Sequence, residues 1–413
     1  MKRVFFILLL SFWVHGPALA DPGLGSQVAE LKLMVQELQQ TVVRQQEEID
    51  VLKAASQVAL SAQAVVEPSA MATASAPTAP GVPGSPTRGR WNPDIGVIAD
   101  TVLKLDSPKS DADGADRVSV RELELVMGSA VDPYSRFDAS IGFSDLEEVH
   151  LAEAYLTRFD LPLGSTARIG RFKPKAGKAL LYHRDVIETV DYPLVVQRYF
   201  GADGLNKTGV DLTAPLDLPL DSAHEVAFGV LEGGNGEGGT AFGDTRRRPT
   251  LYGHLRNFWD VSETSNLEIG VTQMAGSADA DVSYETNITG VDGTFLHLYG
   301  PDQRLKLQAE LFYMDRQEAL DEDLIGTYAL ADVRFQKQWS TGFRFDYVEP
   351  VNNPLDNPNG ADIGYTGYLT FYQTEFARWR VQMTHIDQAD GEDDNQVMLQ
   401  GIFSIGEHKH KLA

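Results

Sequence analysis

The stretch Leu305-Lys306-Leu307-Gln308-Ala309-Glu310-Leu311 decides the fold class of this chain. Its apolar residues alternate strictly with polar ones, and Tyr313 continues the apolar series. Because successive side chains of a β-strand point to opposite faces, this pattern produces one apolar face and one polar face. The same alternation recurs at 341–349 and at 395–405. The sequence therefore predicts strands that are apolar on one side and polar on the other.

Segments of this kind fill the chain from about Ile95 to its end, and there are sixteen of them. Strands of about ten residues, apolar outside and polar inside, are typical of a transmembrane β-barrel. Such a barrel needs no long apolar run, since its backbone hydrogen bonds are made between strands. We therefore predict an all-β fold, a closed antiparallel barrel of sixteen transmembrane strands. The expected strands cover residues 95–105, 118–131, 136–145, 148–159, 166–174, 206–216, 223–232, 250–260, 267–276, 288–299, 305–317, 325–336, 341–349, 362–373, 378–388 and 395–405.

The connections between these segments alternate in length. They are tight after even-numbered strands, as at 132–135, 300–303 and 374–377. They are mostly longer after odd-numbered strands, as at 175–205 and 233–249, and a short link after the third strand is the exception. In outer-membrane barrels the short turns are periplasmic and the long loops are external. An even strand count then puts both ends of the barrel in the periplasm.

The residues before the barrel divide into three regions. Residues 1–20 have the basic start, apolar stretch and small-residue end of a secretory signal peptide. Residues 27–55 carry four heptads with Val or Ile at one core position and mainly Leu at the other, which predicts a self-associating α-helical coiled coil in the periplasm. A lone helix lying on the barrel is the alternative. Residues 56–90 form a Pro-, Ala- and Ser-rich linker, and residues 91–413 form the barrel.

Composition and motifs argue against several classes of function. The net charge of −24 argues against nucleic-acid binding, and the chain has no Cys for disulfides or thiolate metal sites. Asp111, Asp113 and Asp116 lack the spacing and terminal Glu of a calcium loop, so we expect no metal and no cofactor. The chain has no G-x-S-x-G motif, and we expect that it is not an enzyme. A barrel lipase, the enzymatic alternative, would require a Ser–His pair that faces lipid near the rim.

The fifth strand and the long loop behind it are basic for so acidic a chain. Seven Lys and Arg residues lie between positions 168 and 198, against the three acids Asp185, Glu188 and Asp191. A basic constriction would concentrate anions, and Arg can bind carboxylate or phosphate through two hydrogen bonds. The alternative is that these charges are solvated or pair with the three acids. The candidate constriction and solute-binding residues, one His included, are Arg168, Arg171, Lys173, Lys175, Lys178, His183, Arg184 and Arg198.

The same region resembles a known family. The stretch Ile169-Gly170-Arg171-Phe172-Lys173-Pro174 resembles the signature of phosphate-selective-type outer-membrane porins, and so does Asp191-Tyr192-Pro193-Leu194. The coiled coil before the barrel is similar to that of the dicarboxylate-porin branch. The resemblance covers about residues 93–216. It implies a sixteen-stranded homotrimer, an inward loop that narrows each pore, and diffusion of small anions.

Two features depart from that family's pattern. The chain ends Lys411-Leu412-Ala413 rather than on an aromatic residue. Inward-facing bases, such as Arg344 and Arg380, are mixed with acids, such as Glu124 and Glu310. Phosphate selectivity is therefore not expected to carry over.

We expect a passive outer-membrane porin for small solutes, with anions as the candidate class, constricted by the 175–205 loop. Its expected partners are outer-membrane lipid, lipopolysaccharide and further copies of the chain in a homotrimer. The alternative is structural: a barrel in the cell outer membrane whose periplasmic coiled coil tethers or spaces the envelope. A wall-binding module would favour that alternative, and none is visible before Val28.

Overall fold

The computed structural model describes residues 93–106, 117–144, 148–219, 222–317, 322–351 and 360–406. The signal peptide, the coiled coil and the linker, expected within residues 1–90, lie outside the described residues and stay predictions. Within the described ranges, no helix is both long and apolar enough to cross a membrane.

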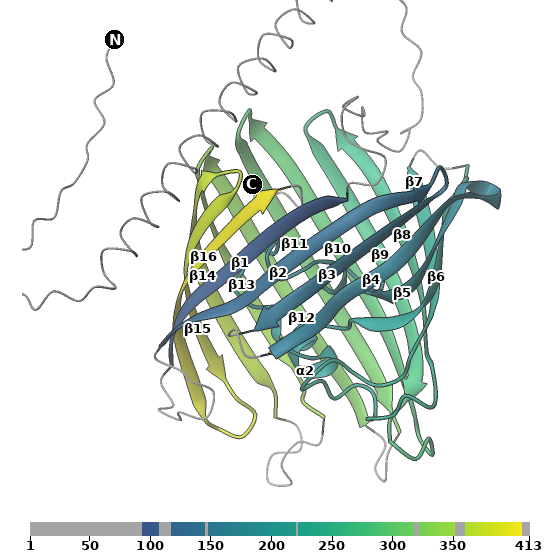
Figure 1. Ribbon diagram of the computed structural model, residues 1–413. Coiled ribbons are helices and arrows are strands. Elements are labelled where there is room, and N and C mark those ends of the chain that lie inside the picture. Colours follow the sequence, from purple (N-terminus) through teal and green to yellow (C-terminus); the bar gives the residue numbers. More distant parts are fainter. Residues whose placement is uncertain are drawn as a thin grey trace, which may run out of the picture. The chain divides into compact units, whose positions relative to one another are not determined.

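In the described part of the chain, sixteen antiparallel strands form a closed barrel (Figure 1). Each strand pairs with its neighbours in the chain, and β1 closes the ring by pairing with β16. This confirms the predicted fold, and the largest boundary differences are the starts of β10 and β12, each three residues earlier than expected. The strands are β1 (Asp94–Asp106), β2 (Arg117–Asp132), β3 (Ser135–Ser144), β4 (Glu148–Leu161), β5 (Ser165–Phe172), β6 (Lys207–Leu216), β7 (Ala223–Leu231), β8 (Thr250–Ser262), β9 (Ser265–Ser277), β10 (Glu285–Gly300), β11 (Gln303–Arg316), β12 (Glu322–Gln336), β13 (Trp339–Val348), β14 (Asp362–Thr374), β15 (Ala377–Asp387) and β16 (Asp393–Gly406).

The two faces of the sheet differ in chemistry as the alternation predicts. On β11, Leu307 and Leu311 point outward and are each 42% exposed. Gln308 and Glu310, which alternate with them, are buried on the inner face. A soluble protein would turn its apolar face inward, so an apolar outer face around a closed barrel fits contact with lipid.

Most register shifts between paired strands lie next to the turns, but two β-bulges lie away from the turns and interrupt the alternation. The register of β1 and β2 shifts beside Asp100, and the register of β3 and β4 shifts beside Ser140. Each shift inserts one unpaired residue, Arg121 on β2 and Ala152 on β4. A bulge lets two consecutive residues face the same side of a sheet. Strand β2 therefore turns both Arg121 and Glu122 toward the lumen, which strict alternation does not predict.

The predicted asymmetry of the connections is also present. Two-residue links join even-numbered strands to the next strand at 133–134, 263–264 and 301–302. The connection from β5 to β6, residues 173–206, is the longest link between consecutive strands. A connection of this length without a strand of its own is uncommon in a compact fold and usually has a function.

Candidate functional site

Residues 173–206, here called the lumen loop, pack against the inner wall of the barrel. Their helix α2 (Leu194–Phe200) contacts β12 and β13 (Figure 1), and a 3-10 turn, η3 (Ala179–Leu181), precedes it. Phe200 meets Phe312 of β11 edge to face, with 5.3 Å between ring centroids. Burying an apolar side chain of this size contributes about 1.5–3 kcal/mol. The buried apolar residues of the loop are Ala176, Ala179, Leu180, Ile187, Val190, Tyr192, Leu194, Val195, Val196, Tyr199, Phe200 and Leu205.

Two wall carboxylates bind the backbone of the lumen loop where its helical turns begin. Glu310 of β11 accepts hydrogen bonds from the N–H groups of Lys178 and Ala179, at 2.9 and 3.1 Å. Asp346 of β13 accepts one from the N–H of Leu194, the first residue of α2, at 2.9 Å. The first N–H groups of a helix lack partners within it, so an oxygen acceptor on the wall satisfies them. Each carboxylate thus fixes one turn against the wall.

Several wall arginines, Arg380 and Arg344 among them, bind carbonyl groups in the irregular part of the loop. Arg380 of β15, which is 1% exposed, donates to the carbonyls of Ile187 and Thr189 at 3.0 and 2.6 Å. Arg344 of β13 donates to the carbonyl of Asp191 at 2.9 Å. Backbone groups buried without a partner are costly, so an irregular segment inside a barrel needs such donors. The inner wall supplies them from side chains.

The eight candidate site residues are all engaged, and most of their partners lie on the barrel wall. Two of the three loop acids also pair with wall bases: Glu188 with Lys306 at 2.7 Å, and Asp191 with Arg121 at 2.8 Å. The positive surplus of the segment is therefore compensated by acids outside it. The contacts are Arg168 with Asp211 (2.5 Å), Arg171 with Glu232 (3.5 Å), Lys173 with the Asp203 carbonyl (2.7 Å), Lys175 with Glu225 (3.3 Å), Lys178 with Glu268 (2.7 Å), His183 with Glu153 (3.3 Å), Arg184 with Asp203 (2.6 Å) and Arg198 with Asp362 (2.7 Å).

Four of the candidate residues meet around one cavity of about 240 Å³. Arg171, Lys173, His183 and Arg184 line it, together with Glu122 of β2. The acids Asp203 and Glu237 also border this cavity. The lining therefore brings cationic and acidic side chains together around a polar space.

A second cavity of about 340 Å³ is lined by residues that sequence reasoning did not select. The remaining four candidates, Arg168, Lys175, Lys178 and Arg198, border neither cavity. The sequence feature that could have indicated the second cavity is the adjacent charged pair Arg121-Glu122 in a predicted strand, because a bulge lets two consecutive side chains face the lumen. The charged side chains that line it are Lys104, Asp106, Arg117, Arg121, Asp191 and Arg344.

Neighbouring charges keep two groups of the lumen loop ionised. Burial acts to lower the pKa of Lys178, but the charges and hydrogen bonds of Tyr182 and Glu268 outweigh it and raise the pKa. Burial acts to raise the pKa of Glu188, but the ion pair with Lys306 outweighs it and lowers the pKa. Charged contacts with β9 and β11 thus hold the first half of the loop at neutral pH.

One arrangement on the outer face bears on the enzymatic alternative. Ser222 Oγ lies 2.9 Å from His224 Nε2, and His224 Nδ1 lies 2.6 Å from Asn257 Oδ1. A nucleophile, a base and an orienting group in this order occur in acyl-transfer enzymes. His224 is only 5% exposed, and neither cavity borders it. The absence of enzymatic activity therefore stays a prediction.

Comparisons with known proteins find similar folds but no matching family or curated sequence. Three solved structures are similar in fold. OprB of Pseudomonas putida has 10% identity and a TM-score of 0.54, covering 76% of this chain and 94% of that one. An anion-selective porin from Comamonas acidovorans has 9% identity and a TM-score of 0.52, covering 76% and 99%. The outer membrane channel DcaP of Acinetobacter baumannii has 12% identity and a TM-score of 0.51, covering 76% and 96%.

At these identities the likeness is one of fold. The chain has the sixteen-stranded barrel fold of outer-membrane porins. Membership of the phosphate-selective or dicarboxylate branch remains a prediction from the sequence motifs.

Removing the Arg380 guanidinium should loosen the lumen loop without opening the barrel. Arg380→Met leaves the carbonyls of Ile187 and Thr189 without these donors, at a cost of about 1–3 kcal/mol for each buried group. We expect faster amide hydrogen exchange across 185–191 and unchanged exchange in the strands. Arg136→Met is the matched control, because Arg136 pairs with Asp138 of its own wall strand at 2.9 Å. Equal exchange in both variants would contradict the anchoring role.

The contact between His183 and Glu153 predicts a pH-dependent contribution to stability. Burial acts to lower the pKa of His183, but the hydrogen bond and charge of Glu153 outweigh it and raise the pKa. The stabilisation is therefore fully present below the unfolded-state pKa of about 6.5 and is lost as pH rises through the raised folded-state pKa. The difference in thermal unfolding midpoint between the wild type and His183→Gln should be largest in mild acid and shrink in alkali. A difference that grows with pH would contradict this pairing.

Proposed function

We propose that this protein is a passive outer-membrane porin for small solutes, with the lumen loop as its constriction. One observation carries the proposal: a closed barrel with an apolar outer face has a long loop bonded to its inner wall. Diffusion through such a pore needs no reaction and no cofactor, only a polar lining and a limited cross-section.

The charges beside the loop favour small charged or polar solutes, with anions as the candidate class. The larger cavity is lined by four cationic side chains and two acidic ones. The smaller cavity carries the four candidate residues described above and the acids Glu122, Asp203 and Glu237. A lining that contains both signs supports a modest preference for anions rather than exclusion of cations.

The sequence also supports a proposal for the assembly. We propose a homotrimer in the cell outer membrane, in contact with lipid and lipopolysaccharide, whose coiled coil at 27–55 and linker at 56–90 lie in the periplasm after removal of residues 1–20. Heptads that bury a core between chains support self-association. An even number of strands supports placing both ends of the barrel on the side of the short turns.

Planar-bilayer recording tests the function. The purified protein should open in steps grouped in threes, and its reversal potential in a salt gradient should show anion preference. Substituting Arg171, Lys173 and Arg184 together by Glu should shift the reversal potential toward cations. Arg246→Glu serves as the control, because that side chain is 85% exposed on the connection between β7 and β8. Folded protein that never conducts would contradict the porin function.

An ester-hydrolysis assay tests the prediction that the barrel is not an enzyme. Acyl transfer requires donors for the developing oxyanion in addition to a Ser–His pair. We therefore expect lipid and short-chain esters to be hydrolysed at the same background rate by the wild type and by Ser222→Ala. A higher rate in the wild type that Ser222→Ala abolishes would contradict this prediction.

A further inference from the structure

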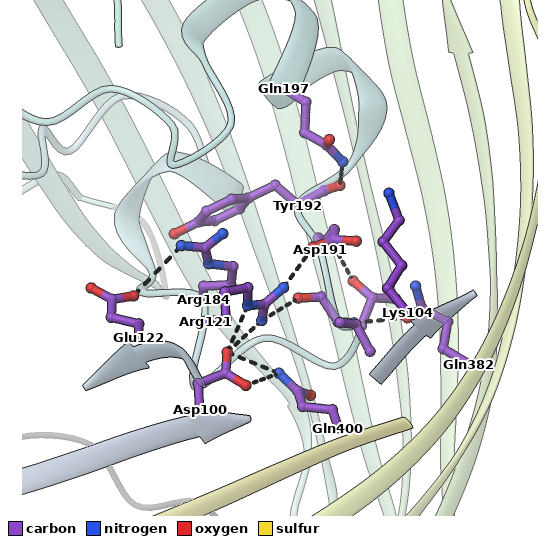
Figure 2. Close-up of polar contacts among 12 residues, drawn as sticks. Asp100, Lys104, Arg121, Glu122, Arg184, Asp191, Tyr192, Gln197, Gln382 and Gln400 are labelled. Atoms are coloured by element: carbon purple, nitrogen blue, oxygen red, sulfur yellow. Dashed lines mark hydrogen bonds and ion pairs between the residues drawn. The ribbon is translucent and has the colours of Figure 1, made fainter. Parts of the chain in front are cut away.

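Strand β2 turns two consecutive charged residues toward the lumen. Arg121 is the extra residue of the bulge opposite Asp100, and Glu122 follows it. In a regular strand one of the two would face outward, since side chains alternate. The bulge removes that alternation and sets a cation beside an anion on the inner wall (Figure 2).

These two residues form crossed ion pairs with the lumen loop. Arg121 Nη1 lies 2.8 Å from the carboxylate of Asp191, and Arg184 Nη2 lies 3.5 Å from that of Glu122 (Figure 2). The wall supplies a cation to a loop acid and an acid to a loop cation, so both contacts are attractive. The Arg121 side chain is 17% exposed, and partly buried pairs are screened less by salt than surface pairs.

Both ends of the Arg121–Asp191 contact are braced. At the wall, Asp100 accepts a hydrogen bond from Arg121 Nε at 3.0 Å and another from Gln400 at 3.1 Å (Figure 2). At the loop, the carbonyl of Asp191 accepts from Arg344 of β13 at 2.9 Å. A continuous run of bonded groups therefore spans the part of the lumen between β13 and β1, which are four strands apart around the barrel. We call this run, Arg344–Asp191–Arg121–Asp100, the cross-lumen bar.

The cross-lumen bar lies between the two cavities. Arg121 and Asp191 line the cavity of about 340 Å³. Their chain neighbours Glu122 and Tyr192 line the cavity of about 240 Å³. Of each two consecutive residues, one lines the first cavity and the other lines the second. The Arg121–Asp191 contact therefore marks the boundary between the two cavities.

We propose that Arg121 determines the size specificity of the pore: it joins the lumen loop to β2, divides the constriction in two, and limits the solutes that pass. This inference rests on the proposed porin function and extends it. A guanidinium suits the position because its fork of donors binds two carboxylates at once, here those of Asp100 and Asp191. Without it, Asp191 loses its ion pair with β2 and Asp100 keeps only the hydrogen bonds from Gln400. The attraction that holds the loop against β2 is then weaker, which widens the gap beside the loop.

Single-channel conductance and solute uptake test the proposal. Arg121→Ala should raise conductance by about 1.5-fold or more, since conductance grows with pore cross-section. Recording in about 1 M KCl screens charges beyond roughly 3 Å, so the change reports width rather than charge. Liposomes containing the variant should also swell in neutral sugars too large for the wild type. Arg136→Ala is the matched control, because it removes the same charge from a wall residue paired with Asp138 of its own strand at 2.9 Å.

Chemical rescue separates the role of the cation from any folding defect. The chain has no Cys, so Arg121→Cys introduces a single thiol. Attaching an aminoethyl group through a methanethiosulfonate reagent restores a positive charge on channels already open in the bilayer. Their conductance should fall toward the wild-type level, whereas the neutral methyl reagent should leave it high.

The outcomes distinguish this inference from the function on which it rests. A conducting wild type whose conductance and sugar limit are unchanged by Arg121→Ala would overturn the inference and leave the porin intact. Folded wild type and Arg121→Ala that are both silent would contradict the porin function itself.

Discussion

The hydrogen bonds between wall side chains and the backbone of the lumen loop are the interaction on which the rest of the structure depends. An irregular segment buried in a barrel has polar backbone groups that neither a helix nor a sheet satisfies. Here the wall supplies acceptors at Glu310 and Asp346 and donors at Arg344 and Arg380. Inward-facing charged side chains of a barrel could be interpreted as the source of an electrostatic field that attracts solutes. Here their main contacts are with the backbone of the loop, which they hold in place.

This use of the wall changes how the charges of the pore are interpreted. A count of Lys and Arg between 168 and 198 suggests a basic constriction, but each cation contacts an acceptor, in most cases a wall carboxylate. Paired charges contribute less field in the lumen than free ones.

Local periodicity predicted the strands. It did not predict how the lumen loop packs or which residues its charged side chains contact, because these depend on residues far apart in the chain. Alternation placed Leu311 outside and Glu310 inside correctly. It did not reveal that Phe312 and Met314, inward and fully buried, form the apolar seat of the loop, because the run 311–314 loses its alternation at that point. The partners of the candidate residues also lie far along the chain, as with Arg198 and Asp362, so no spacing could indicate them. The bulge at Arg121 was visible only as two adjacent charges.

The most direct test of the account is a disulfide between the lumen loop and the wall. A Cβ built on Gly326 of β12 lies 3.1 Å from the Cβ of Val195 on α2. A disulfide needs about 3.5–4.5 Å between these atoms, so a shift of α2 by a few tenths of an ångström away from β12 allows the bond. In a chain without Cys, the double variant Val195→Cys with Gly326→Cys should form the cross-link in folded protein, detected by mass spectrometry without reduction. The pair Val195→Cys with Gly367→Cys should not, since Gly367 has no neighbour within contact distance. Two free thiols in the first pair would contradict a loop seated inside the barrel.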